Sequence, residues 1–174
     1  MSVQEILIVA GPNGAGKTTF ARNHLDLDAR GLTYLNADVI AERLSPGAPE
    51  LADVQAGRQM LAEMDRLAAD GRSFAFETTL SGRGYLRRIQ QWRADGYHVT
   101  LMFLRLPSVD LALSRVRERV ALGGHDVPAR DIHRRYHRGI ANFRREYAQA
   151  VDGWLLFDSE GDRLRLIEWS GDLV

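Results

Sequence analysis

Short apolar runs alternate along this chain with longer segments in which apolar residues recur every three or four positions. The short runs are typical of strands buried in a parallel sheet, and the three-to-four spacing is typical of amphipathic helices. The pattern predicts strands at 6–10, 32–36, 73–77, 97–106, 154–158 and 165–169, and helices at 17–24, 38–44, 50–70, 85–95, 108–122 and 128–147. This alternation predicts an α/β fold, a mostly parallel sheet of five to six strands flanked by helices on both faces.

The residues that follow the predicted strands are the ones expected to meet a ligand. In open parallel sheets, ligands bind beyond the carboxyl ends of the strands. Here those ends are Gly11, 36–38, 77–79, 105–107 and Asp158. Two of the five carry acids that would lie beside a glycine-rich turn, so this edge of the sheet is where we expect the site.

The composition is typical of a single globular domain, which we expect to span 1–174. Of the 174 residues, 45% are hydrophobic and 26% are charged, and a chain of this length can bury one full core. The absence of cysteine excludes disulfides, thiolate zinc sites and a cysteine nucleophile. The apolar run at 6–10 is too short for a signal peptide or a membrane span, so we expect a cytoplasmic protein with no membrane contact.

The charge is balanced in sum but uneven along the chain. The 23 basic and 23 acidic residues cancel, yet residues 83–145 hold 14 Arg against 5 acids. Such a basic segment suggests an anionic partner, although arginines on solvated helix faces would give the same pattern. Of the basic residues, 22 are arginine and the remaining one is Lys17. We infer that Lys17 stands where a compact ammonium is needed, because a planar guanidinium is not equivalent there.

A phosphate-binding loop accounts for that lysine. Residues 11–18 read Gly-Pro-Asn-Gly-Ala-Gly-Lys-Thr and fit the pattern G-x-x-x-x-G-K-[ST] between a predicted strand and a predicted helix. Successive backbone N–H groups of such a loop point at one anion, and the helix N-terminus adds its dipole. We expect ATP to be bound by Gly11, Pro12, Asn13, Gly14, Ala15, Gly16, Lys17, Thr18 and Thr19. Lys17 would reach the β- and γ-phosphates, and the Thr18 hydroxyl would bind Mg²⁺.

Two strand-end acids favour a kinase among the P-loop NTPases. A GTPase needs an Asn-Lys-x-Asp motif, which the single, already assigned lysine excludes. Asp38 could accept the proton of an acceptor hydroxyl, or it could simply cap the helix that follows it. Glu77 could orient Mg²⁺-bound water or contact the acceptor. The hydroxyl residues that follow, Thr79 among them, could donate hydrogen bonds to the substrate.

A lid is expected at about 115–135. Gly123 and Gly124 would form its hinge between two arginine-bearing helices, and its closure would exclude water from the reaction. Helical projection places Arg119 and Arg135 on the flanks of the apolar stripes, from which they could reach the γ-phosphate, whereas Arg115 points further out. His125 is expected to be a lid contact or a turn residue, since no second metal ligand stands at suitable spacing.

Several segments, in this order, resemble the zeta toxin family of P-loop kinases. They are 10–19, 36–38, 76–79 and 123–128, followed by Arg134-Arg135-Tyr136. The resemblance implies that Asp38 is the catalytic base and Lys17 the phosphate lysine, with Glu77 and Thr79 as acceptor contacts. It also implies that Arg119 and Arg135 clamp the γ-phosphate.

The resemblance carries expectations about substrate and partner as well. Family members studied as toxins phosphorylate UDP-N-acetylglucosamine and are held inactive by a small antitoxin. This chain is considerably shorter than they are, and the insertions that grip a nucleotide-sugar are expected to be missing. An ATP-dependent kinase acting on the hydroxyl of a small molecule is therefore the leading hypothesis, with an antitoxin-like inhibitor as a candidate partner.

Two other readings stay open. A 5′-hydroxyl kinase of nucleic acid would use the basic middle segment as a backbone track, and its binding would be steeply salt-dependent. The arginine cluster coincides with a lid that ATP itself explains, which speaks against nucleic acid. A non-catalytic module that ATP switches through the lid would need neither Asp38 nor an acceptor pocket.

Overall fold

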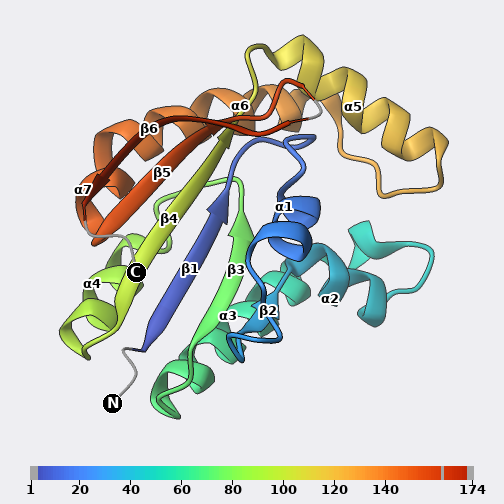
Figure 1. Cartoon of the computed structure of the whole chain (residues 1–174). Coiled ribbons are helices and arrows are strands. Elements are labelled where there is room, and N and C mark those ends of the chain that lie inside the picture. The colour runs from blue at the N-terminus through green and yellow to red at the C-terminus, as the bar shows by residue number, and fades with distance from the viewer. Residues whose placement is uncertain (1–3, 162, 172–174) are drawn as a thin grey trace.

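A six-stranded sheet lies at the centre of the molecule. The computed structural model describes residues 4–161 and 163–171, and the strands lie in the order β2-β3-β1-β4-β5-β6 (Figure 1). Their bounds are Glu5–Ala10 for β1, Thr33–Leu35 for β2, Phe74–Thr78 for β3, His98–Arg105 for β4, Gly153–Asp158 for β5 and Arg165–Gly171 for β6. Strands β1 to β5 are parallel, whereas β6 runs antiparallel to β5 because the connection between them is too short for a crossover. The predicted mostly parallel sheet is confirmed.

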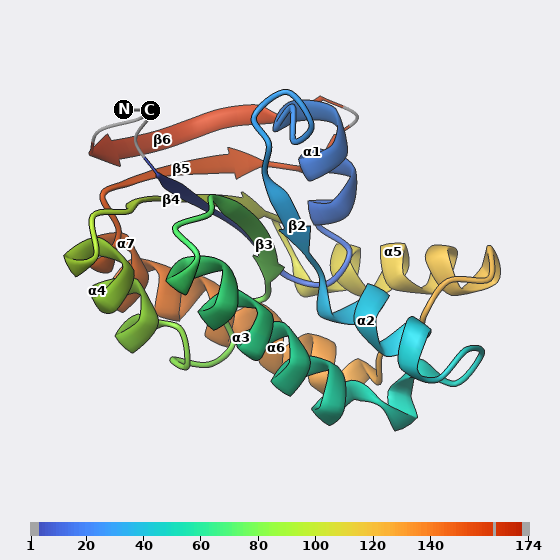
Figure 2. The ribbon, with the colours of Figure 1, turned by 90° about the horizontal axis from the view of Figure 1, so that it is seen from below.

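Helices cover both faces of this sheet (Figure 2). They are α1 Lys17–His24, α2 Ala37–Leu44, α3 Asp53–Ala69, α4 Leu86–Ala94, α5 Val109–Ala121, α6 Ala129–Asn142 and α7 Ala148–Ala150, with a 3₁₀ turn at Pro49–Leu51 and a π-helix at Phe143–Tyr147. Alternate residues of β1 show the two layers. Ile6 and Ile8 pack in the core beneath α3 and α4, whereas Leu7 and Val9 pack beneath α1 and α5.

Helix α6 belongs to both layers. Its first half places Ile132 in the core with α1 and α5, while the π-helix that continues it buries Phe143 in the core with α3 and α4. The helix passes so close to the segment after β3 that a Cβ at Gly139 would collide with the carbonyl oxygen of Thr79. Glycine at 139 therefore fixes the distance between α6 and the carboxyl end of β3.

Two predicted helices differ from the structure. The predicted helix 50–70 begins as a 3₁₀ turn and becomes α-helical only at Asp53. Leu51 and Val54 are apolar residues near the start of the predicted helix, and they are 81% and 71% exposed. The predicted helix 128–147 starts one residue later, after Pro128, and widens into the π-helix at Phe143. Both differences arise at helix ends, where tertiary packing overrides local spacing.

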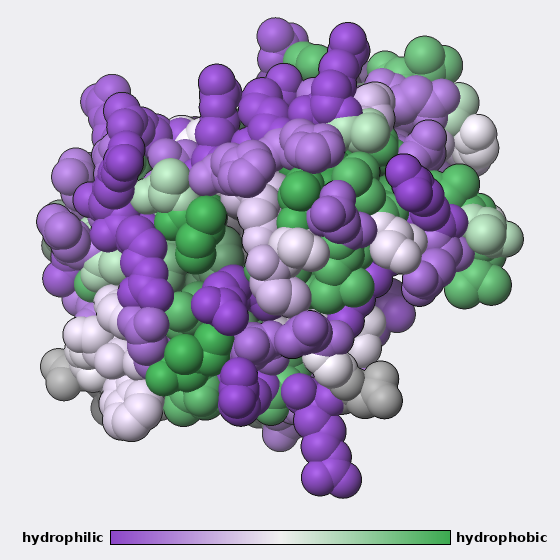
Figure 3. All heavy atoms as spheres, turned by 90° about the horizontal axis from the view of Figure 1, so that it is seen from above, coloured by the Kyte–Doolittle hydropathy of each residue, from purple (hydrophilic) through white to green (hydrophobic). Residues whose placement is uncertain are grey.

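The surface over the carboxyl edge is mainly polar. Seen from above the view of Figure 1, hydrophilic side chains cover much of the molecule (Figure 3). In the part of the chain that the structure describes, no helix combines the length and apolar character needed to cross a bilayer.

Candidate active site

The phosphate loop connects β1 to α1 at the carboxyl edge of the sheet. A Cβ at Gly11 would collide with the carbonyl oxygen of Leu104, and one at Gly14 would press on α5, so the loop is folded tightly against β4 and α5. No side chain caps α1, whose N-cap is Gly16. Its first N–H groups therefore stay available to an anion.

Lys17 bends back over the loop that precedes it. Its Nζ donates hydrogen bonds to the carbonyl oxygens of Gly11 and Pro12, both at 3.1 Å. Burial lowers the pKa of the Lys17 ammonium, while the carboxylates of Glu77 and Asp38 oppose that shift. The single lysine is thus held above the phosphate loop, as the sequence predicted for a phosphate-binding ammonium.

Glu77 lies at the centre of a hydrogen-bond cluster beside the loop. Its carboxylate accepts from Thr18 Oγ1 at 3.0 and 3.2 Å, from Tyr34 Oη at 2.5 Å and from Asn36 Nδ2 at 2.6 Å. Burial, followed by the Glu77 charge and hydrogen bond, raises the pKa of the Tyr34 hydroxyl, so Tyr34 stays a donor. The hydrogen bond from Thr18 places the Glu77 carboxylate beside the first turn of α1, next to the phosphate loop.

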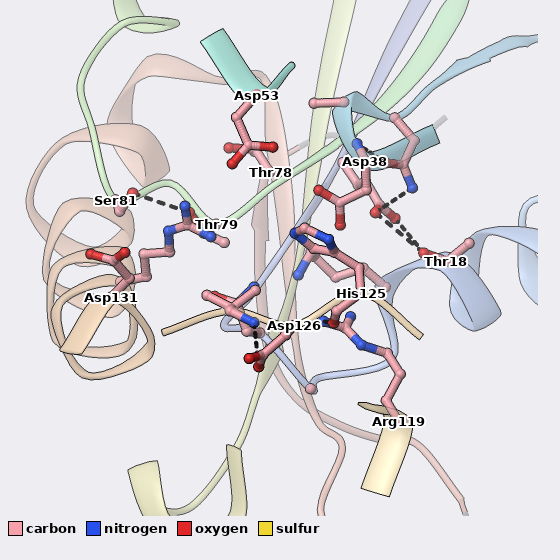
Figure 4. Close-up of a pocket in the computed structure, with 18 of the residues that line it drawn as sticks. Thr18, Asp38, Asp53, Thr78, Thr79, Ser81, Arg119, His125, Asp126 and Asp131 are labelled. Atoms are coloured by element: carbon pink, nitrogen blue, oxygen red, sulfur yellow. Dashed lines mark hydrogen bonds between the residues drawn. The ribbon is translucent and has the colours of Figure 1, made fainter. Parts of the chain in front are cut away.

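Asp38 is not the cap of α2. Asn36 takes that role, because its Oδ1 accepts from the backbone N–H groups of Asp38 (2.8 Å) and Val39 (3.3 Å). The carboxylate of Asp38 is exposed, and among the described residues no hydrogen bond or ion pair engages it. Figure 4 shows Asp38 among the residues that line the pocket. The hypothesis that Asp38 caps α2 is therefore wrong, and the Asp38 carboxylate remains available to contact a ligand.

Helices α5 and α6 bring arginines to the same space. Arg119 Nη2 donates to the carbonyl oxygen of His125 at 2.7 Å, which ties α5 to the loop before α6. Arg119 Nε is buried and has no partner among the described residues, and Arg135 faces the same cavity from α6. Both arginines chosen from the sequence therefore line the cavity.

Arg115 does not point away from the site as helical projection suggested. Its guanidinium donates to the carbonyl oxygens of Gly14 (3.3 Å), Ser159 (2.7 Å) and Glu160 (2.6 Å). It therefore links α5, the phosphate loop and the β5–β6 connection. The projection failed because it places a side chain relative to its own helix, not relative to the loops that pack against it.

The segment after β3 forms another wall and is anchored to α6. Asn142 Nδ2 donates to the carbonyl oxygen of Leu80 (2.7 Å), and Tyr147 Oη donates to that of Gly82 (2.8 Å). Thr79 Oγ1 and Ser81 Oγ are hydrogen-bonded at 3.1 Å on the cavity side of this wall (Figure 4). The wall is therefore positioned by the same helix that carries Arg135.

These elements enclose a cavity of about 740 Å³. Residues singled out from the sequence that line it are Asn13, Gly14, Gly16, Lys17, Thr18, Thr19, Asp38, Glu77, Thr79, Arg119 and Arg135. Gly11, Pro12 and Ala15 shape the loop from behind and do not line the cavity. Asp126, within the segment 123–128 that resembles the zeta toxins, also lines it, although no role was assigned to that residue. Nothing in the sequence indicated that Glu50, Asp53, Tyr85, Arg115 and Asp131 line it as well. No local motif marks these five, because their place depends on how α3, α4, α5 and α6 pack.

The oxygen atoms beside the loop fit a magnesium ion that phosphates help to hold. Thr18 and Glu77 present a hydroxyl and a carboxylate side by side, and Mg²⁺ prefers such ligands, one or two from the protein with the rest from phosphate and water. Among the described residues, no group of three or more His, Asp and Glu is arranged to hold a metal alone.

The family comparisons agree with this architecture. A model of the AAA domain family matches residues 6–138, and the chain belongs to that family. An uncharacterized protein of Haemophilus influenzae is 32% identical over 126 residues, covering 72% of this chain and 87% of the relative.

Solved structures share the fold at lower identity. The AvrRxo1-ORF1:-ORF2 complex with ATP has a TM-score of 0.76 and 17% identity, and the match covers 95% of this chain but only 58% of that one. The PezAT chromosomal toxin–antitoxin system of Streptococcus pneumoniae gives a TM-score of 0.69 and 18% identity, with 97% and 72% covered. A gluconokinase from Sinorhizobium meliloti and a shikimate kinase from Acinetobacter baumannii have the same fold. The P-loop fold is thus confirmed, and the toxin–antitoxin match agrees with the resemblance to zeta toxins.

Proposed function

We propose that this member of the AAA domain family is an ATP-dependent kinase that transfers the γ-phosphate to a hydroxyl of a small molecule. One observation carries the proposal: a single cavity holds the phosphate loop with Lys17, the unengaged carboxylate of Asp38, and two lid arginines. A phosphoryl transfer needs these parts, namely a phosphate cradle, a carboxylate near the acceptor and cations on the transferred group. The ATP of the AvrRxo1 complex and the fold shared with two kinases support it.

The residues divide the work by position. Lys17, the loop N–H groups and the lid arginines Arg119 and Arg135 hold the triphosphate. Mg²⁺, bound through Thr18 with Glu77 beside it, would neutralise phosphate charge. Asp38 accepts the proton of the acceptor hydroxyl while the oxygen of that hydroxyl forms a bond to the γ-phosphorus. The bond from that phosphorus to the β-phosphate oxygen breaks, and ADP leaves.

The acceptor and partner suggested by the resemblance belong to the same proposal. A nucleotide-sugar such as UDP-N-acetylglucosamine is the acceptor that the zeta toxins suggest, with Glu77 and Thr79 as its contacts. The match to a toxin–antitoxin system supports an antitoxin-like inhibitor as partner. Because this chain spans 58% of the AvrRxo1 chain, the activity of that whole protein is not carried over.

The kinase reading is tested with two variants and a metabolite pool. The protein is incubated with ATP, Mg²⁺ and the pool, and products that gain about 80 Da, one phosphoryl group, are sought by mass spectrometry. We expect Lys17→Ala and Asp38→Asn each to abolish the gain, while only Lys17→Ala greatly weakens ATP binding. Full activity of Asp38→Asn would remove Asp38 as the base. Slow ATP hydrolysis without any acceptor would favour the ATP-switch module instead.

A further inference from the structure

The basic residues that line the cavity come from one set of elements. Among the described residues they are Lys17 of the phosphate loop, Arg115, Arg119 and Arg135 of α5 and α6, and His125 of the loop between those helices. The acids Asp126 and Asp131 also line the cavity from this α5–α6 side. The other half of the lining comes from α2, the start of α3 and the segment after β3. Among the described residues that line this half, none is Lys, Arg or His.

Three carboxylates of that half have no partner. Asp38, Glu50 and Asp53 are exposed side chains, and within the described ranges 4–161 and 163–171 no ion pair or side-chain hydrogen bond engages them. In Figure 4, Asp53 lies beside Thr78 at the edge of the cavity. An anionic acceptor would have to approach Glu50 and Asp53, whose charges no cation among the described residues pairs, and repulsion disfavours that approach.

The rest of this half suits a sugar ring. Thr78, Thr79 and Ser81 offer hydroxyls, and Tyr85 adds an aromatic ring that is fixed by packing on Phe76 at 5.0 Å between ring centres. Asn13 of the phosphate loop also lines the cavity; it is only 8% exposed, and its Oδ1 has no partner among the described residues. Buried polar atoms are rarely left unpaired unless a ligand or water completes them. The cavity is thus incomplete without a polar ligand.

We infer that the acceptor is a polyhydroxylated amine, such as an aminosugar, whose protonated amines pair with Glu50 and Asp53 while one hydroxyl reaches Asp38. This inference rests on the proposed kinase function and names the substrate class of the same site. It differs from the nucleotide-sugar acceptor that the resemblance suggests, because a diphosphate would meet carboxylates where it needs cations. It likewise disfavours a nucleic acid acceptor.

Equilibrium binding tests the inference without relying on catalysis. The whole chain is loaded with Mg²⁺ and a nonhydrolysable ATP analogue and titrated with three probes. Neamine carries protonated amines, its fully N-acetylated form keeps the hydroxyls without charge, and UDP-N-acetylglucosamine is anionic. We expect neamine to bind about tenfold more tightly than either other probe, and its binding to weaken as salt is raised. Equal or tighter binding of the neutral or anionic probe would overturn the inference.

Charge-removing variants locate the effect. Glu50→Gln and Asp53→Asn should each weaken neamine binding about two- to fivefold and leave the N-acetylated probe unaffected, as expected for exposed ion pairs. Glu42→Gln is the matched control, since Glu42 lies on nearby α2 outside the cavity and an amide oxygen can still accept from Gly47 N–H. A loss of stability alone would affect both probes alike. Equal losses in the control and the two variants would show that general charge, not the cavity, governs binding.

The two proposals can fail separately. If neamine binds as expected but no aminosugar gains a phosphoryl group with ATP, the cavity binds polyhydroxylated amines as ligands and the kinase function fails. If neutral metabolites are phosphorylated while neamine does not bind, the kinase function stands and the aminosugar inference is overturned.

Discussion

The side chain of Asn36 links the backbone of Asp38 to the carboxylate of Glu77. Its Oδ1 accepts from the backbone N–H of Asp38 at 2.8 Å, and its Nδ2 donates to Glu77 Oε1 at 2.6 Å. The one side-chain amide of Asn36 thus positions both the turn that carries Asp38 and the Glu77 carboxylate beside Thr18. Substitutions of Asn36 can remove the hydrogen bond to Glu77 and keep the one to the Asp38 backbone.

Asn36→Asp should lower kcat/KM by about 10- to 100-fold with little loss of fold, the usual range when a supporting hydrogen bond at such a site is lost. Aspartate caps helices as well as asparagine does, so α2 keeps its start. The new carboxylate cannot donate to Glu77 and repels it. Steady-state kinetics as a function of Mg²⁺ concentration checks this, and we expect a raised Mg²⁺ requirement. Asn36→Ser, which caps but carries no charge, should show a smaller effect. Activity of both variants at the level of the unaltered protein would contradict the positioning role.

Arg115→Ala should raise the KM for ATP about tenfold, the order of one charge-assisted hydrogen bond, and change the acceptor KM little. The reason is that Arg115 joins the phosphate loop at Gly14 to the β5–β6 connection at Ser159. Arg117→Ala is the control, because Arg117 is exposed on the same helix and does not line the cavity. An unchanged KM for ATP in Arg115→Ala would show that the loop needs no such support.

Gly139→Ala should lower the free energy of unfolding by about 1–3 kcal/mol, because the added methyl group collides with the Thr79 carbonyl. Gly57→Ala, in the middle of α3 with open space around it, should instead raise that free energy by up to about 1 kcal/mol. Urea denaturation of both variants gives the comparison. A neutral Gly139→Ala would mean that α6 and the β3 segment are free to separate.

Alkaline pH should destabilise the protein through its tyrosines. Burial is the first cause that raises the pKa of Tyr34, Tyr85, Tyr97, Tyr136 and Tyr147 above 10.0, for Tyr147 to about 12. The unfolded chain therefore loses phenolic protons near pH 10 while the folded chain keeps them. Stability is then fully present below pH 10 and declines as pH rises above it. Absorbance titration of phenolate should show later ionisation in the folded protein than in urea. Coincident titration curves would contradict this.

The sequence predicts most of the fold because its signals are local. Each apolar run gave a strand, and the loop at 11–18 has a residue pattern that fixes its position between β1 and α1. Asp38 and Glu77 were found because strand ends of a parallel sheet meet at one edge. Asp38 and Glu77 can be recognised because each lies at the end of a predicted strand.

What the sequence did not show depends on packing between distant segments. Asp53 and Arg115 look like ordinary charges on helix surfaces, and only the placement of α3 and α5 brings them to the cavity. Leu51 and Val54 fit an apolar face, yet the chain turns there before α3 begins. The sequence left Asp38 as a possible cap of α2, and it did not distinguish Asp38 from the actual cap Asn36, because both residue types cap helices and stand two positions apart.

The two-layer placement of α6 limits how far the site can open. A hinge motion that began at Gly123 and Gly124 could swing α5's tip and the first turns of α6, but Phe143 and Tyr147 are fully enclosed beneath the sheet. Gly139 is pressed on Thr79 and stays with the wall after β3, so only the part of α6 before Gly139 can move together with Arg135. The site would then open by a small rotation of that part of α6, and the wall after β3 would not change its shape.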